Sequence, residues 1–142
     1  GPGSTPGNRD IRGVAISETG RIVVSASSRA QVYEFTAPAT LTPIAGTGTP
    51  GSSGDGNQGT AAQLAAPGGL AFDTMGNLYI ADANRVRKLS TSGIISTVAT
   101  SSAASFSGPI NLGGIAVDAA GTVYATLPTF PVPSLWRSNG AG

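Results

Sequence analysis

The 142-residue chain contains no cysteine and no histidine. Disulfides, thiolate nucleophiles, histidine acid–base relays and most zinc sites therefore cannot be built from its own residues. The sequence predicts no catalytic residue, no cofactor and no metal ion in this chain, and hence no enzyme activity of its own.

Charged residues are also scarce: they make up 11% of the chain, and the net charge is +1. So small a charge provides no electrostatic attraction to nucleic acids or to an anionic membrane. No run of about 18 apolar residues is present that could span a bilayer. We therefore expect neither a nucleic acid nor a membrane as partner. A hydrophobic content of 39% disfavours disorder, which combines low hydrophobicity with high charge.

Glycine and proline are abundant, with 21 and 10 residues. This composition indicates tight turns between short apolar segments, as in all-β sandwiches, barrels and propellers. Residues 1–10 are interpreted as the remnant of a cleaved expression tag followed by a flexible N-terminus, because GPGS at the start resembles such a remnant. The folded region is expected to be 11–142.

Three segments of the chain superimpose without gaps: RGVAISETGRIVVSA (12–26), GGLAFDTMGNLYIAD (68–82) and GGIAVDAAGTVYATL (113–127). Each has an apolar run, a polar turn that begins with Ser or Asp and ends with Gly, and a second apolar run. This pattern predicts two strands joined by a hairpin, in which the first side chain of the turn accepts hydrogen bonds from backbone N–H groups. The turn glycines Gly20, Gly76 and Gly121 are 56 and 45 residues apart, and a period of roughly 40–50 residues is that of propeller blades.

Further strands are expected after each hairpin. Third strands are predicted at 31–35, 85–89 and 134–137, and fourth strands at 41–45 and 95–99. Pro43 cannot donate to a strand ladder and is expected in the outermost strand. The predicted blades are therefore about 11–47, 68–101 and 113–142, the last without a fourth strand.

The segment 46–67 is the longest irregular stretch. Thr60 and Gln63 have the spacing of a capping box, which predicts one helical turn before Pro67. Gly54 lies in this segment, which we expect to adjust to substitution. Gly76 closes a hairpin and is expected to need a positive φ, so Gly76→Val is predicted to be more damaging than Gly54→Val.

The stretch AGTGTPGSSGDGNQGTAAQLAAPGGLAFDTMGNLYIADANRVRKL (45–89) resembles the NHL repeats of bacterial secreted proteins and of the teneurin propeller. The shared features are the GDG loop, the T-x-A-Q-L turn, the start of the first strand and the GNLYIAD second strand. The first repeat departs from the family with Ser17 and Ser25 where acidic residues are usual. The third departs with Thr126 in place of the Asp82 equivalent and with the insertion 128–133.

The resemblance implies an all-β fold, an NHL-type β-propeller with about three four-stranded blades in this chain. A propeller of this family commonly has six blades, so the chain would form half of the ring. The resemblance also implies a secreted or periplasmic protein.

Acidic residues were considered as functional groups. Asp55 begins a loop that suggests calcium, but the residue at the closing position is Ala66 instead of Glu, so a turn-rich linker is the better interpretation. Asp73, Asp82 and Asp118 are the acidic residues of the repeat cores. Asp73 and Asp118 occupy matching turn positions, which favours a structural capping role over catalysis.

Two other groups remain as weak candidates for a binding surface. Arg85, Arg87 and Lys88 form a short basic cluster, for which a solvated strand face is a better interpretation than RNA binding, because no aromatic platform accompanies it. Phe130 and Trp136 lie in the one aromatic-rich patch, which fits an interface anchor or an ordinary core equally well.

The expected function is that of a non-catalytic scaffold that recognises a protein or carbohydrate partner through loops on a propeller face. One alternative is a propeller hydrolase or lyase whose catalytic residues lie in blades absent from this chain. A second is an RNA-binding NHL propeller. Because three blades leave two sheet faces without a neighbour, a homodimer that closes a six-bladed ring is also expected.

Overall fold

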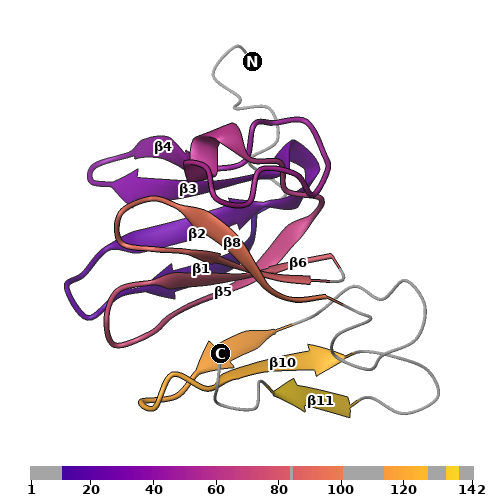
Figure 1. The fold of residues 1–142 in the computed structure, drawn as a ribbon. Helices are drawn as coiled ribbons and strands as arrows, with labels where there is room; N and C mark the ends of the chain where they lie inside the picture. Colours follow the sequence, from indigo (N-terminus) through magenta and orange to yellow (C-terminus); the bar gives the residue numbers. More distant parts are fainter. Residues whose placement is uncertain (1–10, 84, 101–113, 128–133, 138–142) are drawn as a thin grey trace.

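The computed structural model describes residues 11–83, 85–100, 114–127 and 134–137. These residues form three antiparallel sheets (Figure 1). Blade 1 consists of β1 (Ile11–Ile16), β2 (Ile22–Ala26), β3 (Gln31–Thr36) and β4 (Thr40–Ala45). Blade 2 consists of β5 (Pro67–Phe72), β6 (Leu78–Asp82), β7 (Arg85–Leu89) and β8 (Ile95–Thr100). Blade 3 consists of β9 (Ile115–Val117), β10 (Val123–Leu127) and β11 (Ser134–Arg137).

The predicted third and fourth strands are thus confirmed, each with a boundary shift of at most one residue. Two short 3-10 helices, η2 (Ser27–Arg29) and η3 (Gly59–Ala61), complete the described elements. Neither helix, nor any other in the described part of the chain, has the length and apolar character needed to cross a membrane.

The hairpin that opens each blade is closed by the first side chain of its turn. In blade 2, Oδ1 of Asp73 accepts hydrogen bonds of 2.9 Å from the N–H groups of Met75 and Asn77. Oδ1 of Asp118 accepts the equivalent bonds from Ala120 and Thr122 in blade 3. These contacts confirm the capping role predicted for the two aspartates, since the same geometry recurs at the same place in two repeats.

Ser17 caps the turn of blade 1 in the same way, because its Oγ accepts the N–H of Arg21 at 3.0 Å. The strand register assigns Ser25 to a different position from the one expected. Ala26, opposite Ile11, corresponds to Asp82, opposite Pro67, so Ser25 is the counterpart of Ala81. The interpretation of Ser25 as a replacement for an acidic residue is therefore wrong.

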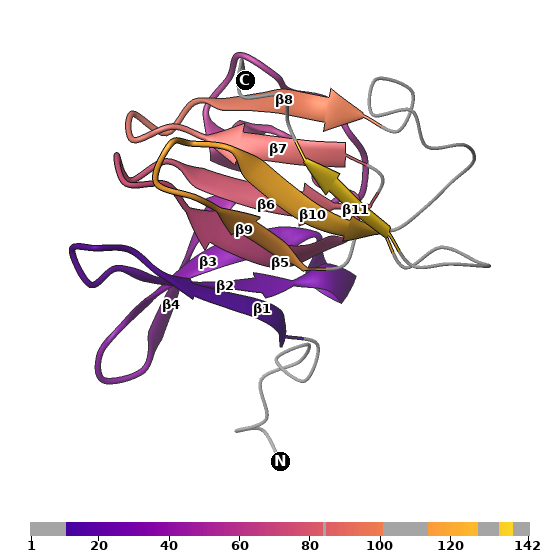
Figure 2. The same cartoon turned by 90° about the horizontal axis from the view of Figure 1, so that it is seen from below.

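The blades lie side by side in chain order, with β5 of blade 2 between β1 and β9 (Figure 2). The approach of blade 1 to blade 2 is close at Gly13, where an added Cβ would lie 2.3 Å from the carbonyl oxygen of Gly68. A side chain at this position cannot be accommodated without moving the two strands apart.

Two apolar cores lie between the blades. The core between blades 1 and 2 is built from the buried residues Val23, Val32, Ala45, Ala62, Leu64, Leu70, Leu78, Ile80, Leu89 and Ile95. The core between blades 2 and 3 is built from Tyr79, Ala81, Val86, Val123 and Ala125. In blades 2 and 3, the first and third residues of the second strand therefore face the blade before them.

The segment between blades 1 and 2 is held by backbone hydrogen bonds along its length. Gly46 N–H donates to Gly59, and Gly51 N–H donates to Leu64. The segment also pairs with the start of β8, where Gln58 and Ile94 form an isolated bridge. Pro43 lies in β4, the outermost strand of blade 1, as predicted.

Two expectations for this segment were wrong. The helical turn before Pro67 is present as η3, but the expected capping box is absent: the N-cap is Gln58 instead of Thr60, and no side chain caps the helix. The Gln63 side chain instead accepts a hydrogen bond from the Ser53 hydroxyl at 2.8 Å. Gly54 is also more constrained than expected: its φ is +103°, and an added Cβ would lie 2.5 Å from the Ala62 Cα and Cβ atoms.

Candidate functional site

The turn aspartates have little freedom to act on a substrate. Besides the two turn amides, Asp73 accepts hydrogen bonds from the Asn77 side chain at 3.0 Å and the Tyr79 hydroxyl at 3.3 Å. Desolvation of Asp73 acts to raise its pKa, but the hydrogen bonds outweigh it and the pKa lies below its ordinary value. Asp73 is therefore ionised at neutral pH and engaged in its own turn.

Asp82 is fully buried at the end of β6. Its carboxylate accepts hydrogen bonds from the backbone N–H groups of Ala65 and Ala66, the shortest being 2.7 Å. Burial raises the pKa of Asp82 above its usual value, partly offset by these two amides and by the nearby arginines. Its role in the described structure is to fix the segment that leads into β5.

Arg87 is the largest fully buried side chain of the described residues. Its guanidinium donates to the carbonyl oxygen of Gln63 at 2.8 Å and to Oδ1 of Asp55 at 2.9 Å, and it lies 3.9 Å from Asp82. The interpretation of this strand as a solvated basic face is therefore wrong for Arg87. Arg87 joins β7 to the inter-blade segment, and Asp55 serves as its partner.

The other two residues of the basic cluster lie on β7 next to Arg87. Arg85 is half-buried, and it faces Asp82 in the strand register. Lys88 lies with its Nζ 5.7 Å from the centroid of the Tyr79 ring. Trp136 belongs to β11, where it is paired with Ala125, while Phe130 lies outside the described residues. A role for Arg85, Phe130 or Trp136 in binding stays a prediction.

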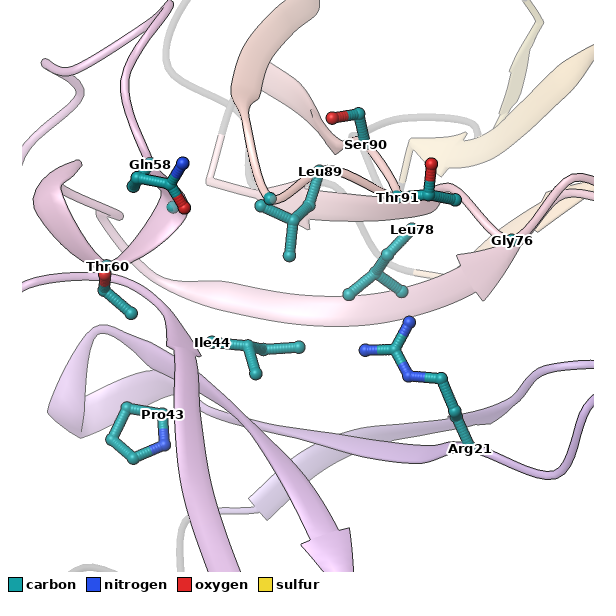
Figure 3. A pocket seen from close by; sticks show the side chains of 12 residues that line it. Arg21, Pro43, Ile44, Gln58, Thr60, Gly76, Leu78, Leu89, Ser90 and Thr91 are labelled. Atoms are coloured by element: carbon teal, nitrogen blue, oxygen red, sulfur yellow. The ribbon is translucent and has the colours of Figure 1, made fainter.

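A pocket of about 260 Å³ opens between blades 1 and 2 (Figure 3). Its lining comes from hairpin turns of both blades, from β4 and from the segment around η3. The lining residues are Arg21, Pro43, Ile44, Gln58, Gly59, Thr60, Gly76, Leu78, Leu89, Ser90, Thr91 and Gly93. Leu78 and Leu89 are buried and provide an aliphatic floor, whereas Thr60 and Thr91 are exposed at the rim.

Arg21 supplies the positive charge of this pocket. Its Nε and Nη2 atoms donate to the two carboxylate oxygens of Glu34 at 3.2 and 3.0 Å. The guanidinium carbon also lies 5.7 Å from the centroid of the Phe72 ring, across the boundary between the blades. The planar guanidinium, paired with Glu34 in this bidentate geometry, lines one side of the pocket.

Sequence reasoning singled out none of the pocket's polar lining residues as binding groups. They come from separate segments, and no local motif links Arg21 to Thr60 or Thr91. Their proximity depends on the stacking of two blades, which no local pattern in the sequence encodes. Within the part of the chain that the structure describes, no three Asp or Glu side chains gather closely enough to hold a metal ion.

The sequence is similar to that of teneurins. Residues 44–114 match the Teneurin NHL domain family. A stretch of 47 residues, 33% of the chain, is 49% identical to Teneurin-1 of Caenorhabditis elegans and covers 2% of that protein.

Two solved structures have the same fold at low sequence identity. A protein of unknown function from Bacteroides thetaiotaomicron is matched with a TM-score of 0.70 and 18% identity, over 90% of this chain and 47% of that one. A gluconolactonase from Xanthomonas campestris is matched with a TM-score of 0.67 and 15% identity, over 93% of this chain and 44% of that one. The chain thus spans less than half of either structure.

These likenesses confirm the β-propeller fold expected from the repeats. The family match spans half of the chain and includes the whole of blade 2 and the segment before it. The chain therefore belongs to the Teneurin NHL domain family.

Proposed function

We propose that the chain is a non-catalytic NHL-repeat module that recognises a protein partner through the pocket between blades 1 and 2. The observation that carries this proposal is the structural engagement of the blade carboxylates. Asp73 and Asp118 bind turn amides, and Asp82 binds the backbone ahead of β5. A general acid or base must be able to reach a substrate proton, and these three groups are already committed.

The pocket has the features of a recognition site for one side chain. Its volume of about 260 Å³ is below the range of roughly 300–1,000 Å³ that is usual for small-molecule and cofactor sites. The aliphatic floor of Leu78 and Leu89 suits an aliphatic side chain of the partner. The polar rim, with Arg21, Thr60 and Thr91, would bond the partner's backbone or an adjacent acidic group. A carbohydrate partner is the competing possibility.

Peptide and glycan probes separate these two kinds of partner. The chain would be screened against a displayed random-peptide library and against a glycan array, and the best probes measured by isothermal titration calorimetry. Thr60→Trp would place a large ring at the mouth of the pocket, and Thr47→Trp is the matched control on an exposed site away from it. We expect peptides to bind and Thr60→Trp alone to weaken them at least tenfold.

Peptide binding that is equally strong in both variants would contradict the assignment of the pocket. Glycan binding that is lost in Thr60→Trp would replace the protein partner with a carbohydrate.

Hydrolase activity is the second candidate function, because the gluconolactonase of Xanthomonas campestris has the same fold. We expect this chain to hydrolyse gluconolactone no faster than buffer does, and to carry no stoichiometric metal after dialysis. Hydrolysis that is lost in Asp73→Asn, or a metal found at one equivalent by elemental analysis, would favour the enzyme. Catalytic groups in blades outside this chain would require the parent reading frame to be found.

RNA binding is less well supported than either function. Such binding needs an accessible basic surface, and Arg87 is buried in an ion pair with Asp55. We also propose a secreted or periplasmic location, which is supported by the relationship to teneurin.

A further inference from the structure

One sheet face of blade 1 is apolar and exposed at β1, while Tyr33 on β3 of the same face is buried. Residues directly opposite one another in neighbouring strands share a face of the sheet. The register therefore gives two rows on this face, which we call the open face: Val14, Val24, Tyr33 and Pro43, then Ile16, Ile22, Phe35 and Leu41. Val14 is 62% exposed and Ile16 is 66% exposed, which is unusual for large apolar residues in a strand.

The same positions in the next blade are covered by protein. Val14 and Ile16 correspond to Leu70 and Phe72 in the repeat. Leu70 is only 6% exposed, and both residues pack in the core between blades 1 and 2. In blade 3 the corresponding residues, Ile115 and Val117, pack against blade 2. The repeat thus uses this face to dock on a preceding blade, and blade 1 has the docking residues without a described neighbour.

The opposite half of this contact is also present in the chain, on blade 3. Within the chain, the docking face of blade 2 packs on Ala15 and Val23 of blade 1, and the docking face of blade 3 packs on Tyr79 and Ala81 of blade 2. The corresponding residues of blade 3 are Ala116, Tyr124 and Thr126, with Tyr124 paired to Ala116 in the register. Ala116 and Thr126 are exposed. Blade 3 therefore presents a receiving face, with a small residue at the position of Ala15.

We infer that the open face of blade 1 binds the receiving face of blade 3 in a second copy of this chain. Each copy carries both halves of the contact, so two copies form it twice about a two-fold axis and leave neither face exposed. The lengths of the solved propellers support a ring made of two copies, because the chain covers 47% and 44% of them. Two copies together would therefore match most of the length of such a ring. This inference is independent of the partner proposed for the pocket.

Sedimentation equilibrium of the purified chain at micromolar concentration tests the inference. The expected mass is twice the 13.9 kDa of one chain. The double variant Val14→Asp/Ile16→Asp should sediment at the mass of one chain, because it places two carboxylates in the apolar contact. Met75→Asp is the matched control, since Met75 is 79% exposed but lies in the β5–β6 turn, away from both faces. It should remain dimeric.

Ala116→Arg tests the other half of the contact from an exposed position, where the substitution leaves the blade itself intact. It should give a single chain mass with an unchanged circular dichroism spectrum. A folded wild-type chain at 13.9 kDa would overturn the inference. A dimer that survives Val14→Asp/Ile16→Asp would also overturn it, and one that survives Ala116→Arg would show that blade 1 pairs with something other than blade 3.

Discussion

The hydroxyl of Ser25 donates a hydrogen bond of 2.6 Å to the carbonyl oxygen of Gly68, and so connects β2 of blade 1 with β5 of blade 2. Ser25 is fully buried, and the contact lies beside the close approach of Gly13 to Gly68. A polar bond therefore fixes the position of two blades that are otherwise joined by apolar packing.

Ser25→Ala should lower the free energy of unfolding by about 1 kcal/mol, because it leaves the Gly68 carbonyl without this donor. Urea denaturation followed by circular dichroism measures the loss. Ser52→Ala, on an exposed residue of the inter-blade segment, is the control and should change the stability by less than about 0.5 kcal/mol. Equal effects of the two substitutions would remove Ser25 from the contact between the blades.

Arg87→Met should be far more damaging than Arg85→Met. Removing Arg87 leaves Asp82 buried without its cation and frees the Gln63 carbonyl, at an expected cost of about 3–5 kcal/mol. Arg85 is only half-buried, and its replacement should cost about 0.5 kcal/mol. Denaturant unfolding of both variants provides the comparison. If the two losses were similar, the basic cluster would be a surface feature, as the sequence alone indicates.

Gly54→Val should lower the melting temperature more than Gly76→Val, which reverses the order expected from the sequence. Both glycines have a positive φ, which costs a β-branched residue about 1–3 kcal/mol. At Gly54 the new side chain would also collide with Ala62, whereas at Gly76 the nearest atom is Thr91 Cγ2 at 3.3 Å. Thermal melts decide the order, and a larger loss at Gly76 would show that the inter-blade segment adjusts after all.

Acidification should remove the stabilising contribution of Asp73. Its folded-state pKa is lowered, so this contribution is complete above the ordinary aspartate pKa of about 3.9 and is lost as the pH falls through the folded-state value. The stability difference between wild type and Asp73→Asn should therefore shrink below about pH 4. Asp82 and Asp118 are present in both the wild type and the variant, so their contributions cancel in this stability difference. Urea unfolding across this range is the measurement, and a difference independent of pH would argue against the capping role.

The strands could be predicted from the sequence because each repeat carries its own signals. Apolar runs, a Ser or Asp at the start of the turn and a Gly at its end, as in Asp73 to Gly76, act within a few residues. The position of Pro43 could be predicted for the same reason, since the missing donor is a property of the residue itself.

The buried network and the pocket could not be predicted in this way. Arg87 stands between Val86 and Lys88 in β7, and this local pattern is the same for a solvated and a buried arginine. Its burial depends on Asp55, which is 32 residues earlier in the chain. The pocket likewise requires Arg21 and Thr91 from separate blades to lie near one another. The conformation of Gly54 depends on Ala62, which only the folded segment brings close.

The inter-blade segment has a consequence for how copies of this protein meet. Its Gly56 and Asn57 exchange backbone hydrogen bonds with Ile95, so the start of β8 is already paired on its outer side. In blade 1, Pro43 removes a donor from the outer strand. Both features hinder the strand-by-strand addition of other molecules that leads to amyloid-like aggregation. Open-ended growth through backbone pairing is thereby disfavoured at these two edges, whereas the contact between sheet faces that we infer above would stop at two copies.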